Sequence, residues 1–142
     1  MEKRVLKAAI EVAVRFSEVD SMGIVWHGSY AKYFEDAREE FGRQYHLGYL
    51  KIFGEGFYAP LVKLDFNYKK PLVYGDRMRI EIRYIPSAAA KICFEYAIHS
   101  LKEDAIIATG TSMQVFLDRN YELMLFNPQF YADWRVENGV DI

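Results

Sequence analysis

Hydrophobic and polar residues alternate with two different periodicities in the first third of the chain. Apolar side chains first occupy every second position, the pattern of a strand with one buried face, at Ile10, Val12, Val14 and Phe16. They then recur every three or four residues, which predicts an amphipathic helix, at Tyr30, Phe34, Ala37, Phe41 and Tyr45. The sequence therefore predicts a strand followed by a helix, with Gly28 or Ser29 capping the start of the helix and Gly48 following its end.

The alternating pattern returns after the helix and predicts a sheet. Four further strands are expected over residues 62–69, 77–84, 92–101 and 105–117. Their short polar connections favour antiparallel neighbours, and Gly110 is expected to mark a bulge or bend in the last strand. One strand, one helix and four strands predict an α+β architecture in which the sheet wraps the helix, although periodicity alone permits other α+β arrangements.

Two segments have weaker patterns. Residues 49–58 hold two glycines among several aromatic residues, and we interpret them as an ordinary packed loop in preference to a short helical turn beside a pocket. Near the C-terminus, Asn127 and Pro128 are typical of an N-cap followed by proline at the first helical position, which predicts a short helix through Trp134. No linker or repeat interrupts the pattern, so residues 1–142 are expected to form one domain.

Composition and charge narrow the class of protein. With 51% hydrophobic residues among 142, the chain can bury a core, and its net charge of -2 gives no reason to expect nucleic acid or a membrane surface as the main partner. No apolar run is long enough to cross a bilayer, and the single Cys93 fits packing in a reducing compartment. We therefore expect a cytoplasmic protein without a membrane span. The three histidines, His27, His46 and His99, lack the spacing of metal ligands, so neither a metal nor another cofactor is expected.

Asp20 is the leading candidate for chemistry. It follows the first predicted strand and precedes the start of the helix, where backbone N–H groups lack partners and stabilise negative charge. If a carbonyl group lay against these amides, Asp20 would attack it or orient a water that does, while the amides hold the oxyanion. The competing interpretations are that Asp20 only forms a turn or caps the helix, and that His27 is only a packed residue beside Trp26.

Two motifs resemble those of a known family. The run D-x-x-G-x-V-x-H-x-x-Y-x-x-Y-F-E-x-A-R, from Asp20 to Arg38, is similar to the signature of hotdog-fold acyl-CoA thioesterases, and most similar to the branch of the 4-hydroxybenzoyl-CoA and Tol-Pal-associated thioesterases. A second segment, Y-x-x-P-x-x-x-G-D from Tyr68 to Asp76, follows in the family's order. The resemblance covers roughly residues 9–118, and it implies a hotdog fold, with an antiparallel sheet wrapped around one long central helix.

The resemblance also implies an activity and a site. Members of this family hydrolyse an acyl-CoA thioester to a free carboxylic acid and CoA; the Asp at the position of Asp20 acts as nucleophile or general base, and an N–H at the helix start polarises the carbonyl. His27 would position the carbonyl or a water, and it stands where the hydroxybenzoyl-specific enzyme has Tyr, which argues against an aromatic substrate. Substrate contacts, with the lysines meeting the phosphates of CoA, are expected at Gly23, Val25, Gly28, Tyr30, Lys69, Lys70 and Lys91.

The resemblance implies a homo-oligomer, because sites in this family generally lie across a dimer interface. A dimer or a tetramer is expected, with a homotetramer as the specific prediction. Three alternatives concern the chemistry. Glu35 on the helix is a rival to Asp20, because another hotdog branch uses a helix carboxylate. The substrate would otherwise be an acyl-carrier-protein thioester, or the chain would be a non-catalytic module that binds or senses acyl-CoA. A hydratase is the weakest alternative, because those hotdog enzymes place Asp and His differently.

Overall fold

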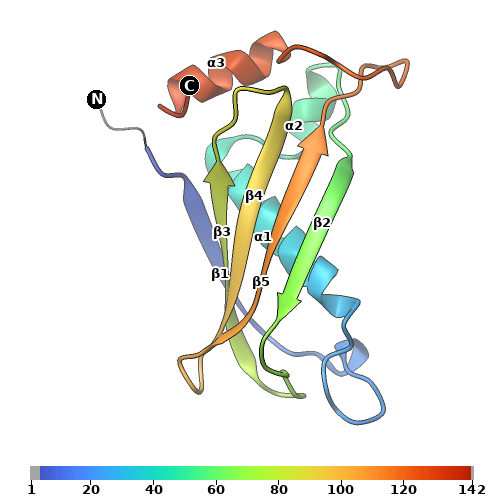
Figure 1. The fold of residues 1–142 in the computed structure, drawn as a ribbon, viewed down its shortest axis with the longest axis vertical. Helices are drawn as coiled ribbons and strands as arrows, with labels where there is room; N and C mark the ends of the chain where they lie inside the picture. The colour runs from blue at the N-terminus through green and yellow to red at the C-terminus, as the bar shows by residue number, and fades with distance from the viewer. Residues whose placement is uncertain (1–3, 142) are drawn as a thin grey trace.

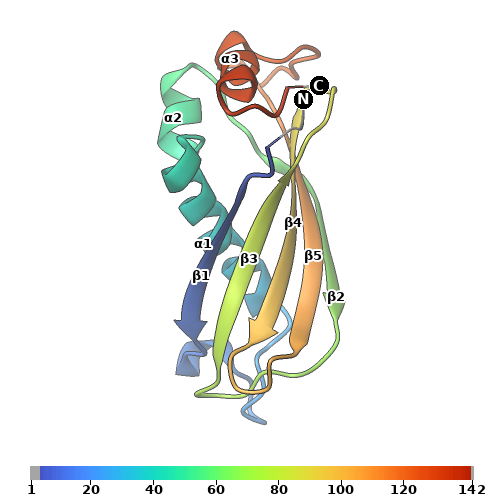
Figure 2. The same cartoon turned by 90° about the vertical axis from the view of Figure 1, so that its left-hand side faces the viewer.

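The computed structural model describes residues 4–141, which form one antiparallel sheet with a long helix across it (Figure 1). The strands are β1 (Lys7–Ala13), β2 (Leu61–Tyr68), β3 (Arg77–Ile85), β4 (Lys91–Ser100) and β5 (Ile106–Val115). The helical elements are η1, a 3₁₀ turn (Phe16–Glu18), and the helices α1 (Ser29–Tyr45), α2 (Tyr49–Gly54) and α3 (Gln129–Glu137). Figure 2 shows α1 and α2 on the same side of the sheet, with α3 near the upper end of the sheet.

The strands pair in the order β1-β3-β4-β5-β2, and every neighbouring pair is antiparallel. β1 and β2 are therefore the two edges of the sheet. Near its start, α1 lies by β2, because the Tyr30 ring packs against Tyr68 with centroids 4.9 Å apart. At its end it lies by β1, where the Tyr45 hydroxyl donates to the Lys7 carbonyl at 3.0 Å. The predicted architecture of an antiparallel sheet around one long helix is confirmed.

Aromatic side chains of α1 fill the core between helix and sheet. The Phe34 ring stacks on Phe66 and Tyr96, with centroids 5.3 and 4.3 Å apart. Two turns further along, Phe41 is completely buried and packs edge-on against Phe94, with centroids 4.8 Å apart. The apolar stripe predicted for the helix is thus the face that the sheet covers.

Three boundaries near the two ends of α1 differ from the predicted ones. Phe16 does not continue the buried face of β1; it is 77% exposed and begins η1, because the chain turns there and buries Glu18 instead. α1 ends with His46 in the left-handed region at φ 59°, and Gly48 is the N-cap of α2. The predicted loop over residues 49–58 is wrong in its first half, where buried Ile52 anchors the short helix α2 against the core.

The C-terminal helix begins later than predicted. Pro128 is the N-cap of α3 and Gln129 its first residue, so Asn127 lies outside the helix and does not cap it. The Tyr131 and Trp134 side chains of α3 are buried, and the indole N–H of Trp134 donates to the Tyr45 carbonyl at 2.7 Å. This contact joins α3 to the end of α1 and explains why the helix is retained although its start has no side-chain cap.

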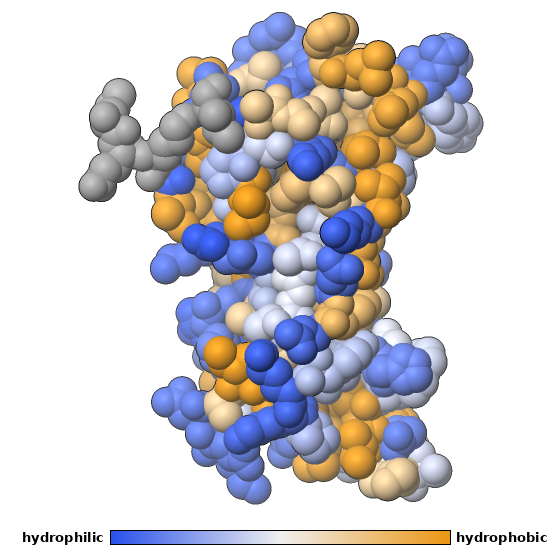
Figure 3. Space-filling model, in the orientation of Figure 1, coloured by the Kyte–Doolittle hydropathy of each residue, from blue (hydrophilic) through white to orange (hydrophobic). Residues whose placement is uncertain are grey.

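The face of the sheet turned away from α1 is polar over its middle, whereas hydrophobic residues gather mainly toward its two ends (Figure 3). Arg83 of β3 pairs with Glu95 of β4, and Thr111 of β5 donates to Asp65 of β2 at 3.0 Å. Cross-strand polar pairs of this kind suit a face that is not covered by a second layer of the same chain. Over residues 4–141, no helix is both long and apolar enough to span a membrane.

Gly110 is not a bulge, which corrects the prediction from the sequence. It pairs in regular register with Phe66 on one side and Tyr96 on the other, and the irregular pairings lie elsewhere in β2 and β4. A Cβ at this position would meet a ring carbon of Phe34 and the Asp65 carbonyl oxygen, each at 2.4 Å. Glycine is therefore required by space, because the Phe34 ring lies directly against the strand.

We expect Gly110→Ala to lower the free energy of unfolding by about 1–3 kcal/mol, since the added methyl group forces Phe34 or the strand to move. Urea denaturation followed by circular dichroism measures this change. Gly54→Ala is the matched control, because a Cβ at Gly54 meets no atom within 4 Å. Equal stability of the two variants would show that the sheet yields at Gly110 without cost.

Candidate active site

Residues 19–28 form a loop between η1 and α1 at one end of the sheet. The Val25 N–H donates to the Leu72 carbonyl at 2.8 Å, and the Tyr74 N–H donates to the Gly23 carbonyl at 3.0 Å. The segment after β2 therefore holds the loop through its backbone. Gly23 has a φ of +76°, in the left-handed region that favours glycine. Gly23 and Val25, both predicted site residues, thus make the backbone hydrogen bonds that hold the loop in place.

Asp20 lies in the turn of this loop with its side chain exposed. Its Oδ1 atom accepts hydrogen bonds from the Met22 N–H at 2.8 Å and from the Ile24 N–H at 3.3 Å. The Asp20 N–H donates to the Ile24 carbonyl at 2.8 Å and closes the turn. Asp20 is therefore a turn former, but this uses only one carboxylate oxygen. The second oxygen, Oδ2, accepts no hydrogen bond from residues 4–141.

Two backbone donors at the start of α1 have no acceptor among residues 4–141. Gly28 is the N-cap, as predicted, and a Cβ there would lie 2.1 Å from the Trp26 ring, so glycine lets the indole pack on the backbone. The Ser29 N–H donates to the Trp26 carbonyl at 2.9 Å. Within the described part of the chain, the N–H groups of His27 and Gly28 donate to no acceptor. Beside a helix start, such amides are suited to hold a negatively charged oxygen.

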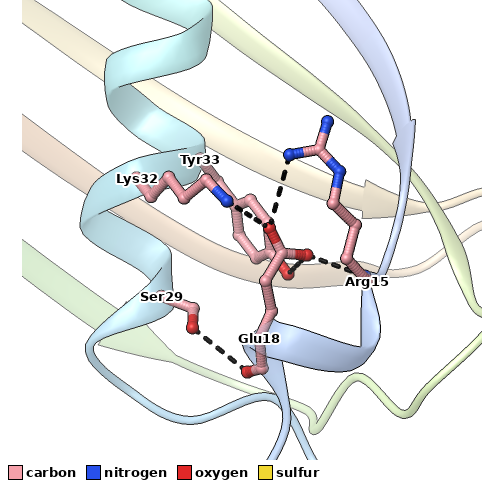
Figure 4. Close-up of polar contacts among 5 residues, drawn as sticks. All are labelled: Arg15, Glu18, Ser29, Lys32 and Tyr33. Atoms are coloured by element: carbon pink, nitrogen blue, oxygen red, sulfur yellow. Dashed lines mark hydrogen bonds and ion pairs between the residues drawn. The ribbon is translucent and has the colours of Figure 1, made fainter.

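Glu18 lies directly before this loop and is not predicted from the sequence as a residue of interest. Its side chain is only 4% exposed, and Oε1 accepts hydrogen bonds from the Arg15 N–H at 2.8 Å and the Tyr33 hydroxyl at 2.9 Å. Lys32 Nζ donates to Oε2 at 3.0 Å, and the Ser29 hydroxyl donates to the Glu18 carbonyl at 3.1 Å. Figure 4 shows the Glu18 side chain between Arg15, which follows β1, and the first turns of α1.

These contacts keep the Glu18 carboxylate charged. Burial raises the pKa of Glu18, but the hydrogen bonds from the Arg15 N–H, Lys32 and Tyr33 outweigh burial and hold this pKa below its usual value. Burial and the hydrogen bond to Glu18 both raise the pKa of the Tyr33 phenol, which therefore stays a donor. The network is thus an ionised carboxylate whose two oxygens both have donors.

β2 brings further predicted residues to the same end of the sheet. The Tyr68 hydroxyl donates to the His27 carbonyl at 3.2 Å, and the ring of buried Tyr30 packs on Tyr68. Burial and the neighbouring Tyr68 raise the pKa of Tyr30, so its phenol stays neutral. Exposed Lys69 and Lys70 follow directly. Tyr30 and Tyr68 therefore pack together at the start of α1. The Lys69 and Lys70 N–H groups donate to the Ile107 carbonyl, so the two lysines lie at this same end of the sheet.

Lys91 lies at the opposite end of the sheet. It pairs with Val115 of β5, whereas Tyr68 pairs with Ala108. These positions on β5 are separated by roughly 23 Å at about 3.3 Å per residue. Within one protomer, the structure does not bring Lys91 together with the other predicted site residues.

Comparison with known proteins identifies the family. The thioesterase-like superfamily matches residues 14–132. The chain belongs to this superfamily. By homology it is a thioester hydrolase, and the predicted family is confirmed.

Relatives and solved structures agree with this membership. An Aquifex aeolicus protein named "Putative esterase" is 36% identical over 99 residues, which cover 70% of this chain and 76% of that protein. "Putative acyl-CoA thioesterase YneP" of Bacillus subtilis is 28% identical over 125 residues, which cover 87% and 89%. The structure of a DHNA-CoA thioesterase from Staphylococcus aureus matches with a TM-score of 0.81 at 23% identity, covering 92% of this chain and 87% of that one. The hotdog fold is thereby confirmed.

A groove of about 720 Å³ lies between α1, α2 and the sheet of this thioesterase-like domain. Ile92 and Phe94 of β4 and Phe57 give it apolar lining, while Glu35 and Arg38 of α1 supply charged groups along one side. None of the residues predicted to contact substrate lines the groove. Glu35, the rival carboxylate, does line it and is exposed there.

Proposed function

We propose that this chain hydrolyses acyl-CoA thioesters with Asp20 as nucleophile or general base. The observation that supports this most directly is one hydrogen-bonded loop. It holds the Asp20 Oδ2 atom and the N–H groups of His27 and Gly28, none of which has a hydrogen-bond partner among residues 4–141. A nucleophile or base next to an oxyanion site is the arrangement that acyl transfer requires.

In this mechanism the thioester carbonyl oxygen accepts hydrogen bonds from the His27 and Gly28 N–H groups, which stabilise the oxyanion that develops. Asp20 either attacks the carbonyl carbon, forming an anhydride that water then opens, or removes a proton from a water that attacks directly. Both routes break the C–S bond, leave the free carboxylic acid and deliver a proton to the departing CoA thiolate. The exposed His27 imidazole would position the carbonyl or the water.

The groove supports an acyl substrate. Its apolar residues suit an acyl group, and its volume lies within the roughly 300–1,000 Å³ usual for small-molecule pockets. Glu35, the groove residue nearest the start of α1, lies six residues after Ser29, or about 9 Å along a helix that rises 1.5 Å per residue. Within one protomer, the helix start and the groove are therefore separate along α1.

A second copy of the chain would join the two halves of this site. β2 is an edge strand, so its outer backbone groups are available for pairing. Tyr68 at one end of β2 contacts the helix start, whereas Tyr58 and Ala59 before the other end line the groove. Antiparallel pairing of two β2 edges would place the helix start of one copy beside the groove of the other. We infer that the site is completed in a homodimer; a tetramer stays a prediction from the resemblance.

The lysines fit this proposal to different degrees. Lys69 and Lys70 are exposed at the end of the sheet where the loop lies, and there they would meet the phosphates of CoA. The Lys70 pair with Glu103 at 3.9 Å is exposed and weak. Lys91 lies toward the end of the sheet that holds Tyr58. It would therefore act, if it binds substrate, on a CoA held by the neighbouring copy.

Release of free thiol from a panel of acyl-CoAs with short, long, branched and aromatic acyl groups tests the proposed function. We expect turnover of at least one member with a kcat/KM of about 10⁴ M⁻¹s⁻¹ or more, a usual value for an enzyme on its own substrate. The same acyl groups on acyl carrier protein form the second arm. Hydrolysis in that arm alone would move the substrate to carrier-protein thioesters, and binding of acyl-CoA without turnover in either arm would contradict an enzyme.

A further inference from the structure

Glu18 joins the loop of Asp20 to α1 through both its side chain and its backbone. The carboxylate binds Lys32 and Tyr33 of α1, as described above. The Glu18 carbonyl also accepts a hydrogen bond from the Trp26 N–H at 2.9 Å, directly before His27. Glu18 itself lies two residues before Asp20. It therefore contacts both sides of the loop, the side that carries the carboxylate and the side that carries the free amides.

Burial of the Glu18 carboxylate costs free energy, so its benefit is expected in the positions that it fixes and not in stability. A buried carboxylate loses much of its hydration, and a buried ion pair is on average no more stabilising than apolar residues of the same volume. Here both oxygens of the carboxylate have donors, and these donors come from Arg15 before η1 and from the first turns of α1. Such a network fixes the relative positions of the segments that it joins more surely than it stabilises the fold.

We propose that Glu18 is a positioning residue, which holds Asp20 and the His27 and Gly28 amides at their working separation. The inference rests on the proposed function and extends it to a residue that does not touch the substrate. The distance from a carboxylate to a carbonyl held by two amides must be correct to a fraction of an ångström, and a misplacement of about 1 Å can cost about 100-fold in rate. Loss of the Glu18 contacts should therefore lower turnover more than substrate binding.

Two variants test this role, and a third serves as the matched control. Glu18→Gln keeps an acceptor for Tyr33 and Arg15 but removes the charge that binds Lys32. Tyr33→Phe removes one buried hydroxyl and its hydrogen bond to Glu18 and is the milder change. Tyr84→Phe also removes one buried hydroxyl, which is bonded to Tyr131 of α3 and lies at the end of β3 that is away from the loop.

We expect kcat to fall about 10- to 100-fold in Glu18→Gln and about three- to tenfold in Tyr33→Phe, with KM within about twofold of wild type. In Tyr84→Phe, kcat should stay within about twofold, although its thermal stability falls as in Tyr33→Phe. Hydrogen exchange gives a readout that does not depend on activity. The peptide that contains Trp26 should exchange faster in Glu18→Gln and Tyr33→Phe than in wild type, and at the wild-type rate in Tyr84→Phe.

The proposal would be overturned if Glu18→Gln and Tyr33→Phe lost stability but kept wild-type kcat and loop exchange. That result would make Glu18 a structural residue only. Failure of the proposed function looks different, because wild type would then hydrolyse no thioester, or Asp20→Asn would remain active. In that case the exchange experiment still shows whether Glu18 orders the loop.

Discussion

Asp20→Asn should lower the kcat for thioester hydrolysis by about 100- to 10,000-fold, the range that a positioned acid, base or nucleophile contributes. The substitution should leave the backbone of the turn unchanged, because the asparagine oxygen can still accept the hydrogen bonds that the Met22 and Ile24 N–H groups donate to Asp20 Oδ1. It removes the negative charge and the free oxygen. Thiol release by the two proteins, with circular dichroism as a check on folding, measures the effect.

Asp118 offers a control of the same geometry. Its Oδ1 accepts hydrogen bonds from the Asn120 N–H at 2.8 Å and the Glu122 N–H at 3.0 Å, and the Asp118 N–H donates to the Glu122 carbonyl at 2.9 Å. This is the turn of Asp20 repeated elsewhere in the chain, without a helix start beside it. Asp118→Asn should therefore leave kcat unchanged. Equal activity of both variants would mean that Asp20, like Asp118, only forms a turn.

The largest expected effect on stability comes from Phe41. Phe41→Ala should lower the free energy of unfolding by about 3–5 kcal/mol, since it removes a buried ring and leaves a cavity in the core. The ring is completely buried and contacts Tyr45 and Phe94 with centroids 4.7 and 4.8 Å away. It lies where α1, the sheet and α3 meet, because Trp134 is also a neighbour. Urea denaturation measures the loss.

Phe126→Ala is the control for this measurement. The Phe126 side chain is 81% exposed, so its removal should change the free energy of unfolding by no more than about 0.5 kcal/mol. A loss in Phe41→Ala as small as in Phe126→Ala would show that the core around α1 closes over the missing ring, and that the helix is held mainly by its other contacts.

The elements with clear periodicity could be predicted from the sequence. Every second residue of β3 and β4 is buried, and the residues between them are exposed or partly buried in β3 and partly buried in β4. The stripe on α1 faces the sheet as its spacing requires. α2 could not be predicted, because a six-residue helix has too few positions to show a period and depends on the burial of Ile52. The bulge predicted at Gly110 is wrong, because glycine is needed there to make room for the Phe34 ring, and Phe34 is distant in sequence.

The residues of the candidate site likewise fall into those that the sequence predicts and those that it does not. Asp20, Gly28 and Tyr30 stand out because the motif places them around one helix start, and in the structure Asp20 lies in the loop that leads to this helix start, which Gly28 and Tyr30 form. Glu18 escaped notice, since an acidic residue after a strand is usually exposed. Its burial depends on Lys32 and Tyr33, which a single sequence does not mark as its partners. A single sequence does not show the strand pairing that separates Lys91 from the loop, so Lys91 is predicted as a phosphate contact although it lies at the opposite end of the sheet.

The strand order also has a consequence for the folding pathway. β3, β4 and β5 are joined by short turns and pair with their neighbours in sequence, whereas both edges are added by pairings across long stretches of chain. Contacts that close long loops cost more chain entropy and tend to form later. The central three strands are therefore expected to nucleate folding, and β1 and β2 to join them afterwards. Because the loop of Asp20 connects β1 to α1, the proposed reaction centre should be among the last parts of the chain to order.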